Sequence, residues 1–131
     1  VRIPITGSGD VKSLSSAKSM MKKTLCNSVM IGRGSIGNPW IFNQQYLNLN
    51  EMQRETYKKN IIIKHIELIR NFFHENQLDM QMKKQLSFYA KGFKNAREFR
   101  NNLFNSKEEI NDLISSFFIE WEKNSKIMVQ I

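Results

Sequence analysis

Apolar and polar residues alternate in two different ways along the chain, and the change of pattern predicts two regions. Residues 1–5, VRIPI, and residues 28–31, SVMI, are short apolar runs typical of strands. Between them Leu14, Ala17 and Met21 recur at helical spacing. The order strand, helix, strand predicts two parallel strands joined by a crossover helix.

Turn and cap residues separate these first elements. The sequence GSGD at residues 7–10 predicts a turn after the first strand, and Ser13 predicts the N-cap of the helix. After the second strand, Asn38 is expected to cap a further helix, with Pro39 at its first position. From there on, every element is predicted to be helical.

Residues 51–75 carry a broad apolar stripe at helical spacing, and Asn50 with Gln53 forms a capping box at the start of this segment. The next helix is expected to be capped by Asp79 and to end at Gly92 in a left-handed conformation. The phenylalanine and methionine stripes are interpreted as the core of a bundle rather than as a surface for stacking bases.

Two further capping boxes predict the starts of the last two helices: Asn95 with Glu98, and Ser106 with Glu109. The predicted fold class is therefore an α/β fragment plus an all-α domain, predominantly helical overall. Residues 1–45 form the α/β part and residues 46–131 the helical bundle. Because two parallel strands do not make a stable sheet alone, the missing strands are expected upstream.

Composition narrows the class of protein. With 131 residues, 40% of them hydrophobic, the chain can form a modest core, and its size does not exclude an enzyme. No uncharged apolar run is long enough to cross a membrane. Cys26 has no partner for an internal disulfide, and His65 and His74 are interpreted as packing or capping residues rather than metal ligands. We expect a soluble protein without a metal, from a reducing compartment that is cytoplasmic or, alternatively, organellar.

The formal net charge of +8 is unevenly distributed. Residues 79–100 contain six basic and two acidic residues, whereas residues 101–126 contain three basic and five acidic residues. This concentration predicts a surface for a polyanion such as nucleic acid, with a general lysine bias as the alternative explanation. The six basic residues are Lys83, Lys84, Lys91, Lys94, Arg97 and Arg100.

Glycine-containing turns follow both predicted strands, at Gly9 and at Gly32. They lie about one β-α unit apart, so in a parallel fold both turns emerge at the carboxyl edge of the sheet. Glycine lets backbone N–H groups approach an anion closely, and Arg33 adds a positive charge to the second turn. The pair indicates a phosphate cradle, with two ordinary tight turns as the alternative.

Three strings of the sequence resemble the tRNA-dihydrouridine synthases. The strings IPITGSGDV and CNSVMIGRGSIGNPWIF are similar to the last barrel strands of that family. The string MKKQLSFYAKGFKNAREFR resembles the motif of its C-terminal helical domain. The resemblance runs in order through residues 3–104. It implies the last two β/α units of a TIM barrel followed by a helical tRNA-binding domain, with the remainder of the barrel upstream in the same protein.

The resemblance also implies a reaction and its cofactors. The family reduces the C5=C6 bond of uridine in tRNA, with FMN as cofactor, NADPH as reductant and a catalytic cysteine as proton donor. By this resemblance two groups of residues are assigned. The FMN phosphate would be held by Ser8, Gly9, Asp10, Gly32, Arg33 and Gly34. The tRNA would be bound by Lys83, Lys84, Lys91, Lys94, Arg97 and Arg100.

Some positions depart from the family pattern. Ser8 stands where the family usually has asparagine, and Lys83, Gln85 and Phe88 replace arginine, histidine and tryptophan. The catalytic cysteine of the family lies in an earlier barrel loop, outside this chain. Cys26 is therefore given a structural role, and no catalytic residue is assigned.

The sequence thus predicts part of a tRNA-dihydrouridine synthase. The isolated chain is expected to be inactive and not to bind FMN tightly. Two alternatives stay open: a different FMN-dependent barrel oxidoreductase acting on a small molecule, and a non-catalytic RNA-binding helical module. A flavin-barrel sequence upstream, with a loop cysteine, would distinguish the synthase from the module.

Overall fold

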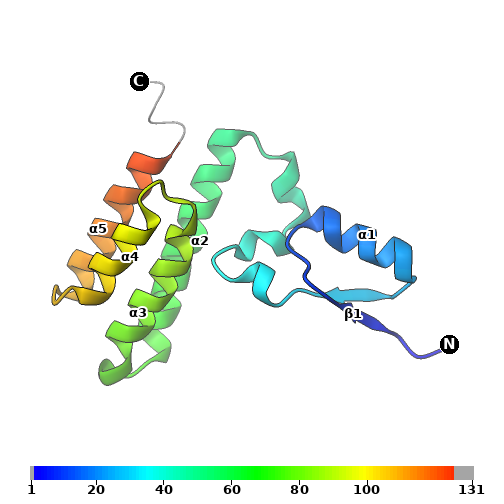
Figure 1. The fold of residues 1–131 in the computed structure, drawn as a ribbon, viewed down its shortest axis with the longest axis horizontal. Helices are drawn as coiled ribbons and strands as arrows, with labels where there is room; N and C mark the ends of the chain where they lie inside the picture. The colour runs from blue at the N-terminus through cyan, green and yellow to red at the C-terminus, as the bar shows by residue number, and fades with distance from the viewer. Residues whose placement is uncertain (1, 126–131) are drawn as a thin grey trace. The chain divides into compact units, whose positions relative to one another are not determined.

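The computed structural model describes residues 2–125, and the chain divides into two compact units, Val1–Leu49 and Asn50–Ile131 (Figure 1). The boundary expected from the sequence lay at residue 45. The structure instead keeps the short helical segment Gln44–Asn48 with the first unit, and the second unit starts at the residue that caps its first helix. Each unit has its own buried apolar residues.

The first unit contains a two-stranded parallel sheet. Strand β1 (Thr6–Ser8) pairs with β2 (Ser28–Met30), and helix α1 (Leu14–Thr24) forms the crossover between them. In the register of the sheet Thr6 lies opposite Ser28, and their hydroxyl oxygens are 2.7 Å apart. The predicted β-α-β order with parallel strands is confirmed.

Strand β1 begins later in the chain than predicted. The backbone N–H of Ile5 donates to Oδ1 of Asn27 and its carbonyl accepts from the N–H of Asn27, each at 2.8 Å. Since β2 begins only at Ser28, the residues before Thr6 have no strand opposite them. The predicted strand at residues 1–5 is therefore wrong, and two of the residues assigned to the following turn belong to β1 instead.

Helix α1 has the N-cap that its sequence predicted. The Ser13 side chain accepts from the N–H of Ser16 at 3.0 Å, and Oγ of Ser16 accepts from the N–H of Ser13 at 3.1 Å. Serine at both positions thus forms a reciprocal capping box. The helix ends at Thr24, and its C-cap Leu25 adopts a left-handed conformation with φ of 58°.

Three short 3-10 helices follow β2: η1 (Arg33–Ser35), η2 (Pro39–Phe42) and η3 (Gln44–Asn48). Pro39 occupies the first helical position, as predicted, but the segment is 3-10 rather than α-helical. The predicted capping role of Asn38 is wrong. Its side-chain amide donates backwards to the carbonyl of Gly34 at 3.1 Å, so it ties the segment to the preceding turn.

In the described part of the second unit, residues 50–125, all regular secondary structure is helical (Figure 1). Helix α3 lies against α2, α4 and α5, so it is the centre of the bundle. The capping box of Asn50 and Gln53 at the start of α2 is confirmed, with the two hydrogen bonds at 2.9 and 3.0 Å. The elements are α2 (Glu51–Phe72), α3 (Glu75–Tyr89), η4 (Ala90–Gly92), α4 (Ala96–Asn105) and α5 (Ile110–Asn124).

The predicted limits of α3 are wrong. Asp79 lies within the helix instead of capping it, and its carboxylate pairs with Lys83 one turn later. At the other end, α3 runs into the 3-10 turn η4, which ends at Gly92. Gly92 is not in the left-handed conformation expected of it, because the tighter 3-10 turn already satisfies the last carbonyls.

The last two predicted capping boxes are also wrong. The side-chain amide of Asn95 donates to Oε2 of Glu120 on α5, at 3.3 Å, instead of capping α4. Oγ of Ser106 accepts from the N–H of Glu108 at 3.1 Å, a local turn that delays the start of α5 to Ile110. The Asn95 side chain thus contacts α5, and the Ser106 side chain closes a local turn, so neither forms the predicted capping box.

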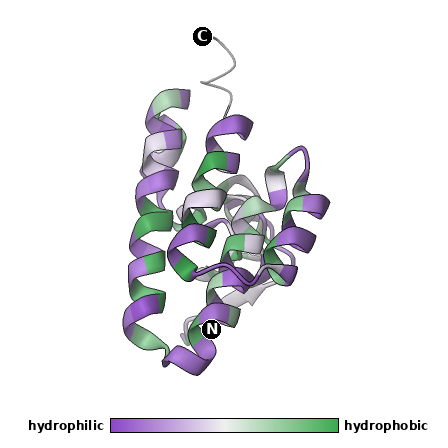
Figure 2. Cartoon of the chain, turned by 90° about the vertical axis from the view of Figure 1, so that its left-hand side faces the viewer, coloured by the Kyte–Doolittle hydropathy of each residue, from purple (hydrophilic) through white to green (hydrophobic). Residues whose placement is uncertain are grey.

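Aromatic rings form the core of the second unit. Phe117 on α5 is fully buried, and its ring centroid lies 5.8 Å from Phe93, 6.2 Å from Phe99 and 6.0 Å from Trp121. Figure 2 shows the helices of the unit as alternating hydrophobic and hydrophilic segments. The prediction that the phenylalanine stripe forms core is confirmed for Phe93, Phe99 and Phe117.

A histidine and a tyrosine join α2 to α3. Nδ1 of His65 lies 2.8 Å from the phenol oxygen of Tyr89, and both side chains are at least partly buried. Burial lowers the pKa of His65 below its ordinary value of 6.5 and raises the pKa of Tyr89 to about 12. His65 is therefore a packing residue, as predicted.

Stability should decrease on mild acidification because of His65. Its pKa in the folded chain lies below 6.5, so the unfolded chain binds more protons in this range. The stabilisation is present above pH 6.5 and is lost as the pH falls through the folded pKa. Urea titrations between about pH 5 and 8 should show this loss, and His65→Gln should flatten it. His74→Gln is the matched control, and an equal flattening by both variants would contradict the assignment.

No helix in residues 2–125 has both the length and the apolar character needed to cross a bilayer. The longest of these helices, α2, carries exposed Lys64, Glu67 and Arg70 in its second half. Within the same residues, no three histidine, cysteine or acidic side chains come close enough together to hold a metal ion.

Candidate functional site

The parallel sheet brings the two predicted phosphate turns to one edge. Ser8 pairs with Met30 in the last register position, so both strands leave the sheet together. A guanidinium nitrogen of Arg33, in the second turn, lies 3.9 Å from Oδ1 of Asp10 in the first. The structure thus places side by side two segments that are separated in the sequence by a helix.

Gly34 marks where the two turns come closest. A Cβ atom at this position would lie 2.1 Å from the carbonyl oxygen of Val11, closer than any real Cβ contact. Only glycine fits this contact without moving backbone. By contrast, a Cβ at Gly32 would meet nothing within 4 Å, so the backbone there faces open space.

Hydrogen bonds orient the peptide groups of the second turn. The carbonyl of Gly32 accepts from the N–H and the hydroxyl of Ser35, at 3.0 and 2.8 Å, and the carbonyl of Arg33 accepts from the N–H of Ile36 at 3.3 Å. In a trans peptide the N–H points opposite to the carbonyl. The N–H groups of Arg33 and Gly34 therefore point away from this internal network. This is the direction in which they can donate to an external anion.

Two cations accompany the first turn. Asp10 adopts a left-handed conformation with φ of 45°, and its carboxylate lies 3.2 Å from Nζ of Lys12 as well as 3.9 Å from Arg33. The Arg33 side chain is 88% exposed, and exposed ion pairs of this kind contribute little energy. Both cations are therefore available to an anion at this edge, where Ser8 and Gly9 are also exposed.

Five of the six basic residues predicted to bind RNA are exposed in the second unit. Arg97 and Arg100 lie on α4, and Lys94 lies just before the start of this helix, so the three fall within one short stretch of the chain. Lys91 lies in η4, directly before this segment, and Lys84 lies on the exposed side of α3.

Lys83 is the sixth predicted residue, and the structure corrects its assignment. It is 6% exposed, and its ammonium lies 2.9 Å from the carbonyl oxygen of Ser106 and 2.9 Å from Oδ2 of Asp79. A buried lysine needs such partners, because an unpaired buried charge is strongly unfavourable. The Lys83 ammonium is committed to these two groups, so we assign it to the internal structure of the bundle and not to an RNA surface.

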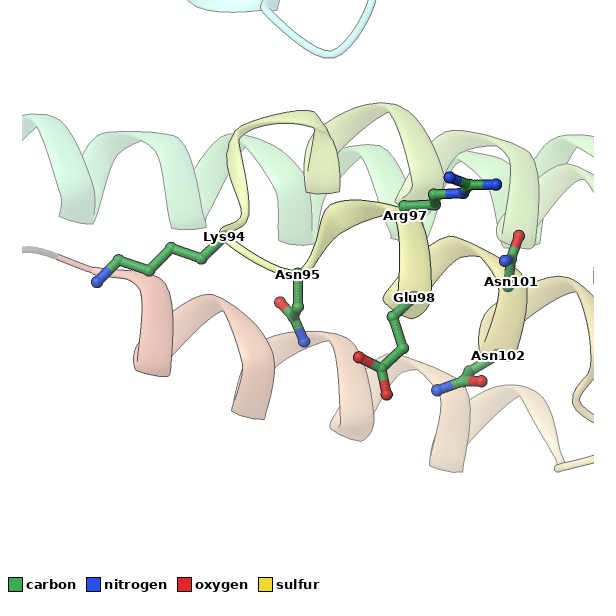
Figure 3. Close-up of a pocket in the computed structure, with 6 residues that line it drawn as sticks. All are labelled: Lys94, Asn95, Arg97, Glu98, Asn101 and Asn102. Carbon is green, nitrogen blue, oxygen red and sulfur yellow. The ribbon is translucent and has the colours of Figure 1, made fainter.

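A shallow hollow on the surface of α4 contains polar residues that sequence reasoning missed (Figure 3). In this view Glu98 and Asn102 extend toward α5, whereas Arg97 and Asn101 lie on the other side of the helix. Asn101 lies four residues after Arg97, and Asn102 four residues after Glu98. Once α4 is known to be helical, this spacing predicts that each asparagine neighbours a charged residue on the helix surface. The lining residues are Lys94, Asn95, Arg97, Glu98, Asn101 and Asn102.

Cys26 lies inside the first unit. It is 8% exposed, and its sulfur is within 3.0 Å of where a Cβ on Gly7 would be. This close contact with the backbone of β1 supports the predicted structural role. A cysteine packed in this way has no room to serve as a proton donor to an external substrate.

A parallel β-α-β unit with two glycine turns at one sheet edge is typical of α/β proteins that bind phosphate groups. The family model described as dihydrouridine synthase matches residues 1–124 of this chain. The chain therefore belongs to the dihydrouridine synthase family.

Curated relatives show the same similarity over most of the chain. A probable tRNA-dihydrouridine synthase of Rickettsia conorii is 28% identical over 97% of this chain and 40% of its own length. The tRNA-dihydrouridine synthase B of Pasteurella multocida is 30% identical over 93% of this chain and 40% of its own length. A probable tRNA-dihydrouridine synthase of Mycobacterium leprae is 32% identical over 77% of this chain. The chain spans about two fifths of the length of the first two relatives.

Proposed function

We propose that this chain forms part of a tRNA-dihydrouridine synthase, an enzyme that reduces uridine to 5,6-dihydrouridine in tRNA. Its membership of the family over residues 1–124 supports this function, as do the printed names of the relatives. The observation that carries the proposal is the meeting of the two glycine turns, because a shared phosphate site requires them to lie at one edge.

The first unit would supply part of an FMN-phosphate site within the last two β/α units of a TIM barrel. The N–H groups of Arg33 and Gly34 and the guanidinium of Arg33 suit a phosphate, and the open space at Gly32 lets it approach the backbone. Asp10 would orient the neighbouring cations. When bound, FMN would supply the hydride for the uridine C5=C6 bond, with NADPH as the reductant. The residues proposed for the site are Ser8, Gly9, Asp10, Gly32, Arg33 and Gly34.

The second unit would bind tRNA through its exposed cations. Extrusion of a uridine into an active site requires a firm hold on folded RNA, chiefly through phosphates and shape. The residues proposed for this role are Lys84, Lys91, Lys94, Arg97 and Arg100. A flavin oxidoreductase that acts on a small molecule does not need such a surface. RNA binding by this unit would therefore favour the tRNA-modifying enzyme over that alternative. We propose a cytoplasmic or organellar location for the enzyme.

Titration with FMN, followed by amide NMR, tests the phosphate site directly. FMN should shift the backbone amides of residues 8–10 and 32–34 weakly, whereas riboflavin, which lacks the phosphate, should not shift them. Gly34→Val should abolish the effect because its side chain would force the turn away from Val11. Gly92→Ala is the matched control, since a Cβ at Gly92 meets nothing within 4 Å.

The titration has clear contrary outcomes. Equal shifts with riboflavin would show that the phosphate is not recognised by these turns. Retention of the FMN shifts in the folded Gly34→Val variant would show that the close approach of the two turns is not needed for the site.

A further inference from the structure

One face of α4 combines two arginines with an exposed aromatic ring. Arg97, Arg100, Asn101 and Phe104 recur at positions i, i+3, i+4 and i+7, so they fall within an arc of about 100° on the helix surface. All four are exposed, whereas Phe99 on the opposite side is buried in the core. These four residues are called the Arg97–Phe104 face.

The arginines of this face have donors available for an anion. Nε of Arg100 donates to the carbonyl of Ala96, at 3.2 Å, which uses one of the five N–H donors of the guanidinium. The only acidic residue of α4, Glu98, extends toward α5 in Figure 3, on the side away from Arg97. The Arg97–Phe104 face is therefore positive, with no carboxylate of its own helix on it.

Phe104 is the aromatic member of the face. It is 45% exposed, so part of its ring is open to a ligand, whereas Phe117 in the core of the same unit is 0% exposed. A half-exposed ring beside two guanidinium groups matches the way in which proteins hold unpaired bases, with an aromatic platform next to phosphate-binding cations.

We propose that the Arg97–Phe104 face binds an unpaired segment of RNA, with Phe104 stacking on a base and Arg97 and Arg100 binding the adjacent phosphates. The proposal rests on the tRNA-binding function proposed above. A duplex does not suit this face, because paired bases are already stacked on one another and a ring on a helix surface cannot reach them. Asn101, beside Arg97, can donate to or accept from a base edge or a ribose.

Replacement of Phe104 separates stacking from charge. Phe104→Ala and Phe104→Leu should each weaken binding of a tRNA transcript by roughly 5- to 150-fold, the effect of one lost base stack. The salt dependence should not change, because no ion pair is lost, whereas Arg100→Ala should reduce the slope of log Kd against log salt by about 1. Phe104→Trp should retain the affinity, and Ile119→Ala, at an exposed position on α5, is the matched control. Binding of a blunt RNA duplex should be insensitive to Phe104.

The outcomes distinguish this inference from the function on which it rests. If Phe104→Leu binds tRNA like the parent chain while Arg97→Ala and Arg100→Ala bind weakly, the stacking role is overturned and tRNA binding stands. An equal loss of tRNA and duplex binding in Phe104→Leu would overturn the preference for unpaired RNA. If none of these variants changes RNA binding, both the inference and the tRNA-binding function proposed for this unit fail.

Discussion

Simultaneous replacement of Lys94, Arg97 and Arg100 by alanine is expected to weaken tRNA binding by about 10- to 100-fold near physiological salt. The three cations are exposed on or next to α4, and each would release counterions from a bound phosphate. The slope of log Kd against log salt should therefore become shallower by about 2 to 3. Fluorescence anisotropy of a labelled tRNA, measured over a range of salt concentrations, gives both quantities.

The control must change the net charge by the same amount elsewhere. Lys64, Lys107 and Lys123 are also exposed in the second unit, and their joint replacement by alanine lowers the net charge equally. This control should keep most of the affinity and of the salt slope. Equal losses in both triple variants would mean that the positive charge of the chain acts only in a general way, without a defined surface.

Phe117→Ala should destabilise the second unit by about 3 to 5 kcal/mol. The Phe117 side chain is 0% exposed and contacts the rings of Phe93, Phe99 and Trp121, so its removal leaves a cavity that these rings cannot fill without leaving their own positions. For a unit of this size such a loss is a large part of the total stability. Urea denaturation followed by helical circular dichroism measures it.

Phe72→Ala provides a matched control for the core substitution. It removes the same side chain from a position that is 84% exposed at the end of α2, and should change the free energy of unfolding by less than about 0.5 kcal/mol. Similar losses in both variants would contradict the assignment of Phe117 as the centre of the core.

Local sequence patterns predicted which helices and strands this chain forms better than the residues at which they begin and end. Ser13 and Asn50 were predicted as caps because an N-cap bonds to an N–H only three residues further along the chain, within reach of a local pattern. The start of β1 was missed because it depends on Ser28, a residue far along the chain that the strand pattern does not contain. Asn95 fits the pattern of a cap, yet in the folded chain its amide reaches Glu120 on another helix.

In the candidate sites, too, the features that depend on local sequence were predicted and those that depend on packing were not. The two glycine turns were predicted as a pair from their spacing, and the parallel register brings them together. Lys83 was misassigned because charge is visible in a sequence and burial is not. Its spacing of four residues from Asp79 was the available sign of an internal pair, although the contact with the carbonyl of Ser106 depends on the packing of the bundle.

The bonds at the two ends of α4 have a consequence for recognition. Before the helix, the N–H of Lys94 donates to Oδ1 of Asn124 at 2.8 Å, and after it the buried ammonium of Lys83 holds the carbonyl of Ser106 at 2.9 Å. The helix is thus fastened to α5 at its start and to α3 at its end. An RNA that binds the Arg97–Phe104 face would meet a surface that is already ordered, so little conformational entropy would be lost on association. Lys83, which would not contact the RNA, would in this way contribute to the affinity of the chain for RNA.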